Sequence, residues 1–260
     1  MSSIGNSEDL IPVIFSFLSP SSYVACSLVS SLWETTSRPY IYQHITALRG
    51  ITFAQCVALF TGDRKLAQYV RSCCFHYSIP ASAYIHDNIS VFIQYILSTC
   101  NNLIALTFWD VPLDGDGLAL LPKGSRLRVL TFQNCTWQYS ALKALLECCT
   151  NTQLLQFCNT PLFSDDRVYH RWNFALWKSR WNPNDVGLAT LTPTSILIQS
   201  PQRQLCNAFW QILLETVNVS TLMYLKLLPH LNDGIDAGRF IAASLHTIRR
   251  LETTVTRKLL

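Results

Sequence analysis

The side chains that could catalyse a reaction or bind a metal are scattered along this sequence. Its six histidines do not form the His-Glu-x-x-His pattern that places two imidazoles on one helix face, and its ten cysteines contain no Cys-x-x-Cys pair. No glycine-rich phosphate loop and no Gly-x-Ser-x-Gly turn occurs. Asp114 and Asp116 resemble the start of a calcium loop, but the glutamate that completes such a loop is missing. The sequence therefore predicts a non-catalytic protein with no metal and no cofactor.

The cysteines are typical of an intracellular protein. Most of them lie among apolar residues, as do the adjacent pairs Cys73-Cys74 and Cys148-Cys149. In a reducing compartment such cysteines behave as small buried hydrophobes. The first nine residues contain no lysine or arginine, so the sequence predicts no secretory signal. We expect ten free thiols and a location in the cytoplasm, the nucleus or both.

One segment interleaves basic and aromatic side chains, and we predict it to be an insertion near residues 164–186. Tryptophan and arginine are enriched at protein interfaces, and this mixture also suits single-stranded nucleic acid. The net charge of +4 is too small to call for a nucleic acid. The interpretations that remain are packing onto the rest of the protein and contact with a protein substrate. The candidate substrate-binding residues are Trp172, Trp177, Trp181, Arg171 and Arg180.

The composition excludes two further classes of protein. A chain with 49% hydrophobic and 14% charged residues has enough apolar surface to fold, so we do not expect disorder. The most apolar stretch, residues 10–33, is interrupted by Pro12, Pro20 and several serines. It falls short of the roughly 20 apolar residues that a membrane span needs. We therefore predict a globular protein that binds no membrane.

A repeated apolar pattern begins after residue 50. Copies of apolar-x-x-Leu-x-apolar start at Leu103, Leu127 and Thr152, with spacings of 24 and 25 residues. Weaker copies start at Val70, Leu222 and Ile248, and residues 195–199 offer one more strand. These spacings match the 20–29 residues of leucine-rich repeats, in which Cys135 would occupy the position of a conserved Asn or Cys. Amphipathic helical patterns separate the strands, which predicts a parallel sheet with helices on its outer face.

The N-terminal stretch predicts helices without a strand. Leu10, Ile14 and Phe17 or Leu18 recur at helical spacing, and Ser19-Pro20 ends the first helix because a residue before proline avoids the helical region. A second helix, capped by Ser21-Ser22, would run through Leu28 and Val29 and carry Trp33 at its exit.

This stretch, roughly residues 8–48, resembles the F-box, of the fungal type. Asn6-Ser7 stands where that family usually has Leu-Pro, and the acidic position is kept as Asp9. The resemblance implies that the chain docks onto the Skp-type adaptor, and through it onto the cullin scaffold, of a ubiquitin ligase. It implies as adaptor-binding residues Leu10, Ile11, Pro12, Ile14, Phe15, Phe17, Leu18, Pro20, Leu28, Val29 and Trp33. The alternative from the residues alone is a helical hairpin that caps the repeat array.

We therefore expect an α/β protein with two parts: an F-box-like helical module at 8–48, and a degenerate leucine-rich-repeat-like solenoid of strand-helix units at 50–260. The predicted function is that of the substrate-recognition subunit of an SCF-type cullin-RING E3 ubiquitin ligase, which holds an unidentified protein substrate on the repeat region. The alternative is a solenoid scaffold for protein–protein interaction with no link to a ligase.

Overall fold

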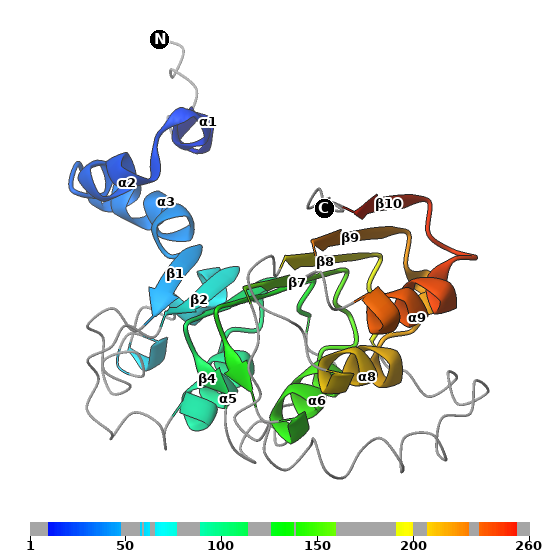
Figure 1. Ribbon diagram of the computed structural model, residues 1–260. Coiled ribbons are helices and arrows are strands. Elements are labelled where there is room, and N and C mark those ends of the chain that lie inside the picture. The colour runs from blue at the N-terminus through cyan, green and yellow to red at the C-terminus, as the bar shows by residue number, and fades with distance from the viewer. Residues whose placement is uncertain are drawn as a thin grey trace, which may run out of the picture.

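The structure, a computed structural model, describes residues 10–47, 58, 60–62, 66–76, 89–113, 126–137, 139–159, 191–199, 207–228 and 234–253. It is a mixed α/β protein in which three N-terminal helices precede a parallel sheet (Figure 1). Among the described residues, no helix is both long and apolar enough to cross a membrane.

In the described part of the chain, eight parallel strands form the main sheet, and each lies beside the one that precedes it along the chain. The sheet therefore grows by one strand at a time along the chain, from the N-terminal edge to the C-terminal edge (Figure 1). The strands are β1 (His44–Ala47), β2 (Ser72–His76), β3 (Ala105–Trp109), β5 (Val129–Gln133), β7 (Leu154–Cys158), β8 (Ser195–Gln199), β9 (Tyr224–Leu228) and β10 (Arg250–Thr253).

Among the described residues, four helices lie on one face of this sheet (Figure 1). They are α5 (Ile89–Thr99), α6 (Tyr139–Cys148), α8 (Asn207–Thr216) and α9 (Gly234–Ser244), and two short 3-10 turns, η2 (Leu66–Tyr69) and η6 (Val219–Thr221), precede β2 and β9. The parallel sheet and its helices confirm the strand and helix patterns read from the sequence. The strand predicted at residues 195–199 is β8.

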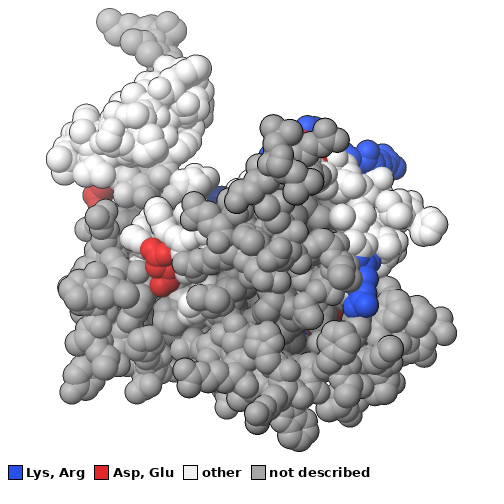
Figure 2. Space-filling model, viewed as in Figure 1, with Lys and Arg blue, Asp and Glu red and all other residues white. Residues whose placement is uncertain are grey.

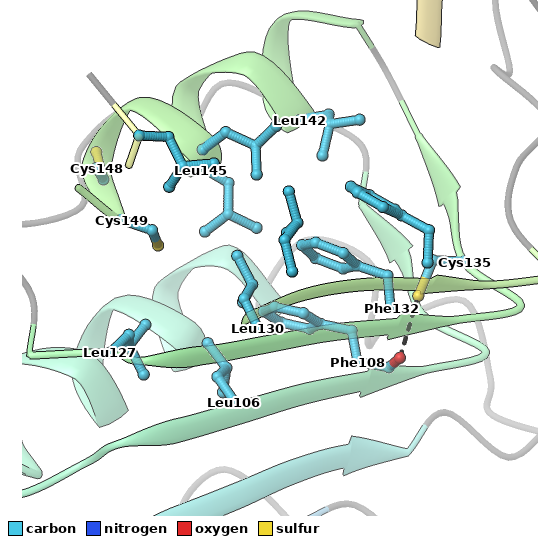
Figure 3. Packing of buried hydrophobic residues seen from close by; sticks show 14 of the residues in the cluster. Leu106, Phe108, Leu127, Leu130, Phe132, Cys135, Leu142, Leu145, Cys148 and Cys149 are labelled. Carbon is cyan, nitrogen blue, oxygen red and sulfur yellow. Dashed lines mark hydrogen bonds between the residues drawn. The ribbon is translucent and has the colours of Figure 1, made fainter. Parts of the chain in front are cut away.

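The strands form because their apolar residues alternate, so that every second side chain is buried on the helical face. The register aligns these side chains in rows across the sheet. One row holds four phenylalanines, Phe75, Phe108, Phe132 and Phe157, whose neighbouring ring centroids lie 5.1–5.5 Å apart. Figure 3 shows Phe108 and Phe132 of this row, with Leu106 and Leu130 of the next row beside them.

The strand ends share a turn that the repeat pattern did not predict. Asp110, Asn134 and Asn159 each follow the last residue of a strand and have φ angles of 50–56°. Asn and Asp tolerate this left-handed conformation better than most residues.

Just beyond two of these turns, β4 (Pro112–Leu113) pairs with β6 (Thr136–Trp137) in a small second sheet. Between turn and strand, the Cys135 thiol donates a hydrogen bond to the carbonyl oxygen of Phe108 at 3.3 Å (Figure 3).

Candidate functional site

The helical module, residues 10–41, consists of three short helices at the β1 end of the sheet (Figure 1). They are α1 (Leu10–Phe17), α2 (Pro20–Ser27) and α3 (Ser31–Ile41). The chain then enters the sheet directly as β1, and α3 also packs against η2. The predicted module of residues 8–48 therefore includes one strand of the sheet, which the sequence reading did not recognise.

Phe15 lies at the centre of the helical module. Its side chain is fully buried, and its ring centroid lies 5.6 Å from that of Tyr23, 5.7 Å from that of Trp33 and 5.1 Å from that of Tyr40. Ile11, one helical turn before Phe15, is also buried. Aromatic rings at these separations attract one another beyond their shared burial. One residue of α2, Tyr23, and two residues of α3, Trp33 and Tyr40, therefore meet α1.

The boundary between α1 and α2 follows the predicted Ser-Pro turn, with one difference. The N-cap of α2 is Ser19 with Pro20 at the first helical position, and the hydroxyl oxygen of Ser19 lies 2.9 Å from those of Ser21 and Ser22. Proline suits this position because its missing N–H would have no partner there. Ser21-Ser22, which the sequence reading took as the cap, belong to the helix itself.

The second helix is shorter than the sequence predicted. It ends at Ser27, and a third helix begins after Ser30, whose hydroxyl oxygen accepts a hydrogen bond from the backbone N–H of Trp33 at 3.4 Å. Glu34 and Arg38, one turn apart on this helix, form an ion pair at 3.0 Å. Trp33 therefore lies inside α3 and faces Phe15, and it is not at the exit of α2.

The outside of the helical module is unusually apolar. Seven of the eleven large hydrophobic side chains that are exposed among the described residues lie on α1, α2 or the turn after α2. No lysine, arginine, aspartate or glutamate occurs between residues 10 and 33. Figure 2 shows this part of the surface as almost entirely uncharged. We call these seven residues the docking surface: Leu10, Val13, Ile14, Phe17, Val24, Leu28 and Val29.

The predicted adaptor-binding residues occupy three environments. Leu10, Ile14, Phe17, Leu28 and Val29 belong to the docking surface, and Pro12 and Pro20 are exposed beside it. Leu18 and Trp33 are half-buried. Ile11 and Phe15 are buried, so their side chains hold the helices together and offer no surface to a partner. The structure adds Val13 and Val24, which the sequence reading missed because no helical period singles out one face of so apolar a stretch.

An apolar surface of this kind can bind a partner by removing its side chains from water. Large exposed apolar patches are uncommon on monomeric proteins and often mark sites that bind a partner. Phe17 and Leu28 are the most exposed of the seven, at 84% and 83%. Large apolar side chains that enter pockets of a partner contribute most of the binding energy of an interface. These two residues are therefore the best candidates for that role.

The face of the sheet opposite the helices carries mainly polar side chains that are half-buried. Thr131 donates a hydrogen bond to the Gln156 side chain at 2.9 Å, and Lys226 pairs with Glu252 at 3.2 Å. The hydrogen bond from Lys226 is the main reason why the pKa of Glu252 lies below its ordinary value. This face could contact a protein partner.

The candidate substrate-binding residues Trp172, Trp177, Trp181, Arg171 and Arg180 lie outside the described residues.

Burial keeps two cysteine thiols from forming the reactive thiolate. Burial raises the pKa of Cys100 and of Cys135 to about 12, so both stay protonated at neutral pH. The thiolate is the form that attacks substrates and binds metals. These two cysteines therefore act as core residues. Cys26, Cys74 and Cys158 are likewise free thiols.

The comparison with known protein families identifies one domain. The F-box domain matches residues 7–39, which include α1, α2 and most of α3. The match supports an F-box protein and an adaptor role in SCF-type ubiquitin ligases, because F-box domains bind Skp-type adaptors. No curated protein matches the chain.

Proposed function

We propose that this chain is the substrate-recognition subunit of an SCF-type cullin-RING E3 ubiquitin ligase. In this proposal the docking surface binds the Skp-type adaptor, which connects the chain to the cullin scaffold. The sheet and its helices form a degenerate leucine-rich-repeat-like array that binds a protein substrate. The observation that carries the proposal is the uncharged, exposed apolar surface on a domain that matches the F-box.

The division of roles within the helical module supports docking. Phe15 and Ile11 stabilise the helices from inside, while Phe17 and Leu28 are exposed at 84% and 83% without contributing to that interior. A partner that covers these side chains would supply the hydrophobic contact that the module alone lacks. A module of about 30 residues gains little stability from its own core, so half of an interface is a reasonable role for it.

The regular arrangement of the sheet supports a repeat array. Each strand pairs with the strands before and after it along the chain, and the register aligns equivalent residues of successive units. The left-handed turns at Asp110, Asn134 and Asn159 recur at the same point of three successive units. In such arrays each unit buries its apolar face against its neighbours, and the remaining face is available for binding.

The proposed contribution to ubiquitin transfer is proximity and not chemistry. A substrate held on the array would have its lysines at a high effective concentration near the ubiquitin-loaded enzyme that the cullin scaffold carries. We accordingly propose that the chain is not an enzyme, needs no cofactor and acts inside the cell, in the cytoplasm, the nucleus or both.

The experiment that tests this proposal is co-purification of the full chain with the Skp-type adaptor. Phe17→Asp and Leu28→Asp place a charge on the docking surface at positions that are more than four-fifths exposed, so both variants should fold normally and lose the adaptor. Leu245→Asp is the matched control, because Leu245 is 60% exposed after the end of α9. Equal adaptor recovery with all four proteins would refute the proposal.

A solenoid scaffold without a ligase link is the second candidate. The sheet alone favours it, since a repeat array needs no adaptor in order to bind proteins. If the unsubstituted chain does not bind the Skp-type adaptor but still captures a protein partner through the array, this candidate replaces the first.

A further inference from the structure

The last strand of the sheet has an edge that no described strand covers. β10 pairs with β9, and Arg250 aligns with Tyr224 in that pair. The backbone N–H of Arg250 bonds to the carbonyl oxygen of Met223, which directs the backbone of residues 250 and 252 toward β9. Because successive residues of a strand alternate in direction, the N–H and C=O groups of Leu251 and Thr253 point outward. An exposed row of this kind is a template for pairing with another strand.

The side chains of β10 are complementary to themselves. Leu251 lies in the core row of the sheet but is 43% exposed, because none of the described strands flanks it on its outer side. Arg250 and Glu252 lie on the opposite face, where the Arg250 side chain is 73% exposed. The Lys and Arg side chains at the upper right of Figure 2 lie around this end of the sheet. One strand thus offers an apolar residue flanked by one positive and one negative charge.

We propose that two copies of this chain associate through β10, antiparallel, about a two-fold axis beside Leu251. In an antiparallel pair, a residue whose N–H and C=O groups point at the partner strand exchanges both hydrogen bonds with the residue opposite it. Leu251 meets this condition and would pair with Leu251 of the second copy. The two sheets would then join into one.

The same register brings opposite charges together. With Leu251 on the axis, Arg250 of each copy lies opposite Glu252 of the other, and directly opposite side chains share one face of the sheet. Within each chain, Glu252 already forms ion pairs with Lys226 and with Arg250. A guanidinium has five N–H donors and a carboxylate two acceptor oxygens, so the contacts between copies can form beside these pairs. The helical module lies beside β1, at the other edge of the sheet, so this pairing leaves both docking surfaces uncovered.

Charge-reversed variants of the full chain test this register. In Arg250→Glu alone, residue 250 would face Glu252 of its copy, and in Glu252→Arg alone, residue 252 would face Arg250. Each reversal puts like charges opposite one another twice, so each variant should dissociate at least about tenfold more readily than the unsubstituted chain. An equimolar mixture of the two variants restores opposite charges at both positions and should associate about as tightly as the unsubstituted chain.

Sedimentation velocity over about 1–100 µM measures these equilibria, because small interfaces dissociate in this range. Arg126→Glu is the control, since it makes the same charge change at an exposed residue outside β10 and should leave association unchanged. A monomeric unsubstituted chain at the highest concentration would overturn the inference. Association that persists in both single variants would also overturn it, as would a mixture that fails to associate.

Discussion

Two phenylalanines of α1, two residues apart, should separate folding from binding. Phe15 is fully buried within 5.1–5.7 Å of three aromatic rings, measured between centroids, whereas Phe17 is 84% exposed. The change to alanine is chemically the same at both positions and keeps the helix propensity high. We expect Phe15→Ala to unfold the helical module, and Phe17→Ala to leave it folded but unable to hold its partner.

The expected energies follow from burial. Truncating a buried phenylalanine costs roughly 3–5 kcal/mol. A folded segment has about 0.05–0.15 kcal/mol of stability per residue, so residues 10–41 hold about 2–5 kcal/mol, which Phe15→Ala removes. Phe17 buries about one-sixth of a side chain of about 200 Å², and losing that contact costs about 0.8 kcal/mol.

Hydrogen exchange of backbone amides, measured on each variant separately, reports whether the helical module is folded. In Phe15→Ala, the amides of α1, α2 and α3 should lose their protection, while those of β5 and β7 keep theirs as an internal reference. In Phe17→Ala, protection should stay close to that of the unsubstituted chain. Binding to the Skp-type adaptor should nevertheless weaken by about 2 kcal/mol, which is roughly 30-fold, if Phe17 is a central contact.

The reasoning fails if the two variants behave alike. Equal loss of protection would mean that Phe17 contributes to folding as much as Phe15 does. Retained protection in Phe15→Ala would mean that the aromatic cluster does not hold the module together. Unchanged adaptor binding in Phe17→Ala would remove this residue from the docking surface.

Three further predictions concern the sheet. Cys100 and Cys135 should resist alkylation at pH 8 in the native chain and react only after denaturation, because burial raises the pKa of both thiols to about 12. Asn134→Ala should destabilise the chain by about 1–2 kcal/mol in urea unfolding because its φ is 53°, whereas Asn134→Gly should be nearly neutral. Lys226→Gln should raise the pKa of Glu252, which an NMR titration measures. The Glu252 carboxylate gives a small stabilisation above its unfolded pKa, and this stabilisation is lost as the pH falls through its folded pKa. Lys226→Gln should make that stabilisation smaller.

Each of these three has a contrary outcome. Rapid alkylation of Cys135 in the native chain would contradict its burial. A stability for Asn134→Ala equal to that of Asn134→Gly would show that the turn imposes no left-handed constraint. A pKa for Glu252 that does not move in Lys226→Gln would mean that Arg250 and Tyr224 alone hold it down.

Most of the sheet could be predicted because one physical pattern produces it. A parallel strand covered by helices on one face buries every second residue. The Leu-x-Phe pairs of β3 and β5 follow this alternation. β1 was missed because Ile45 is the one apolar residue seen to pack on the core among His44, Ile45 and Thr46, and because the strand follows a helix after two residues. One such residue is too few to establish a period of two.

The sequence predicted that the N-terminal helices carry an apolar surface, but it did not predict which of their side chains are buried and which are exposed. The sequence marked α1 as apolar, yet Ile11 and Phe15 face inward while Leu10, Ile14 and Phe17 face water. A helix that is apolar all round has no period that identifies its buried face. Tertiary contact decides the orientation, because Tyr40, far along the chain in α3, stacks on Phe15. The start of α3 was hidden for a similar reason, since Leu28 and Val29 read as a continuation of α2.

β1 directly follows the helical module and forms one edge of the sheet, so the position of each strand sets its distance from that module. Neighbouring strands are about 4.8 Å apart, so the seven intervals from β1 to β10 span about 34 Å. A protein that contacts the sheet at one strand would lie about 4.8 Å farther from the helical module for each strand that separates it from β1. Adding or deleting one strand-helix unit between β1 and the contacted strand would change this distance by about 4.8 Å without altering either binding surface.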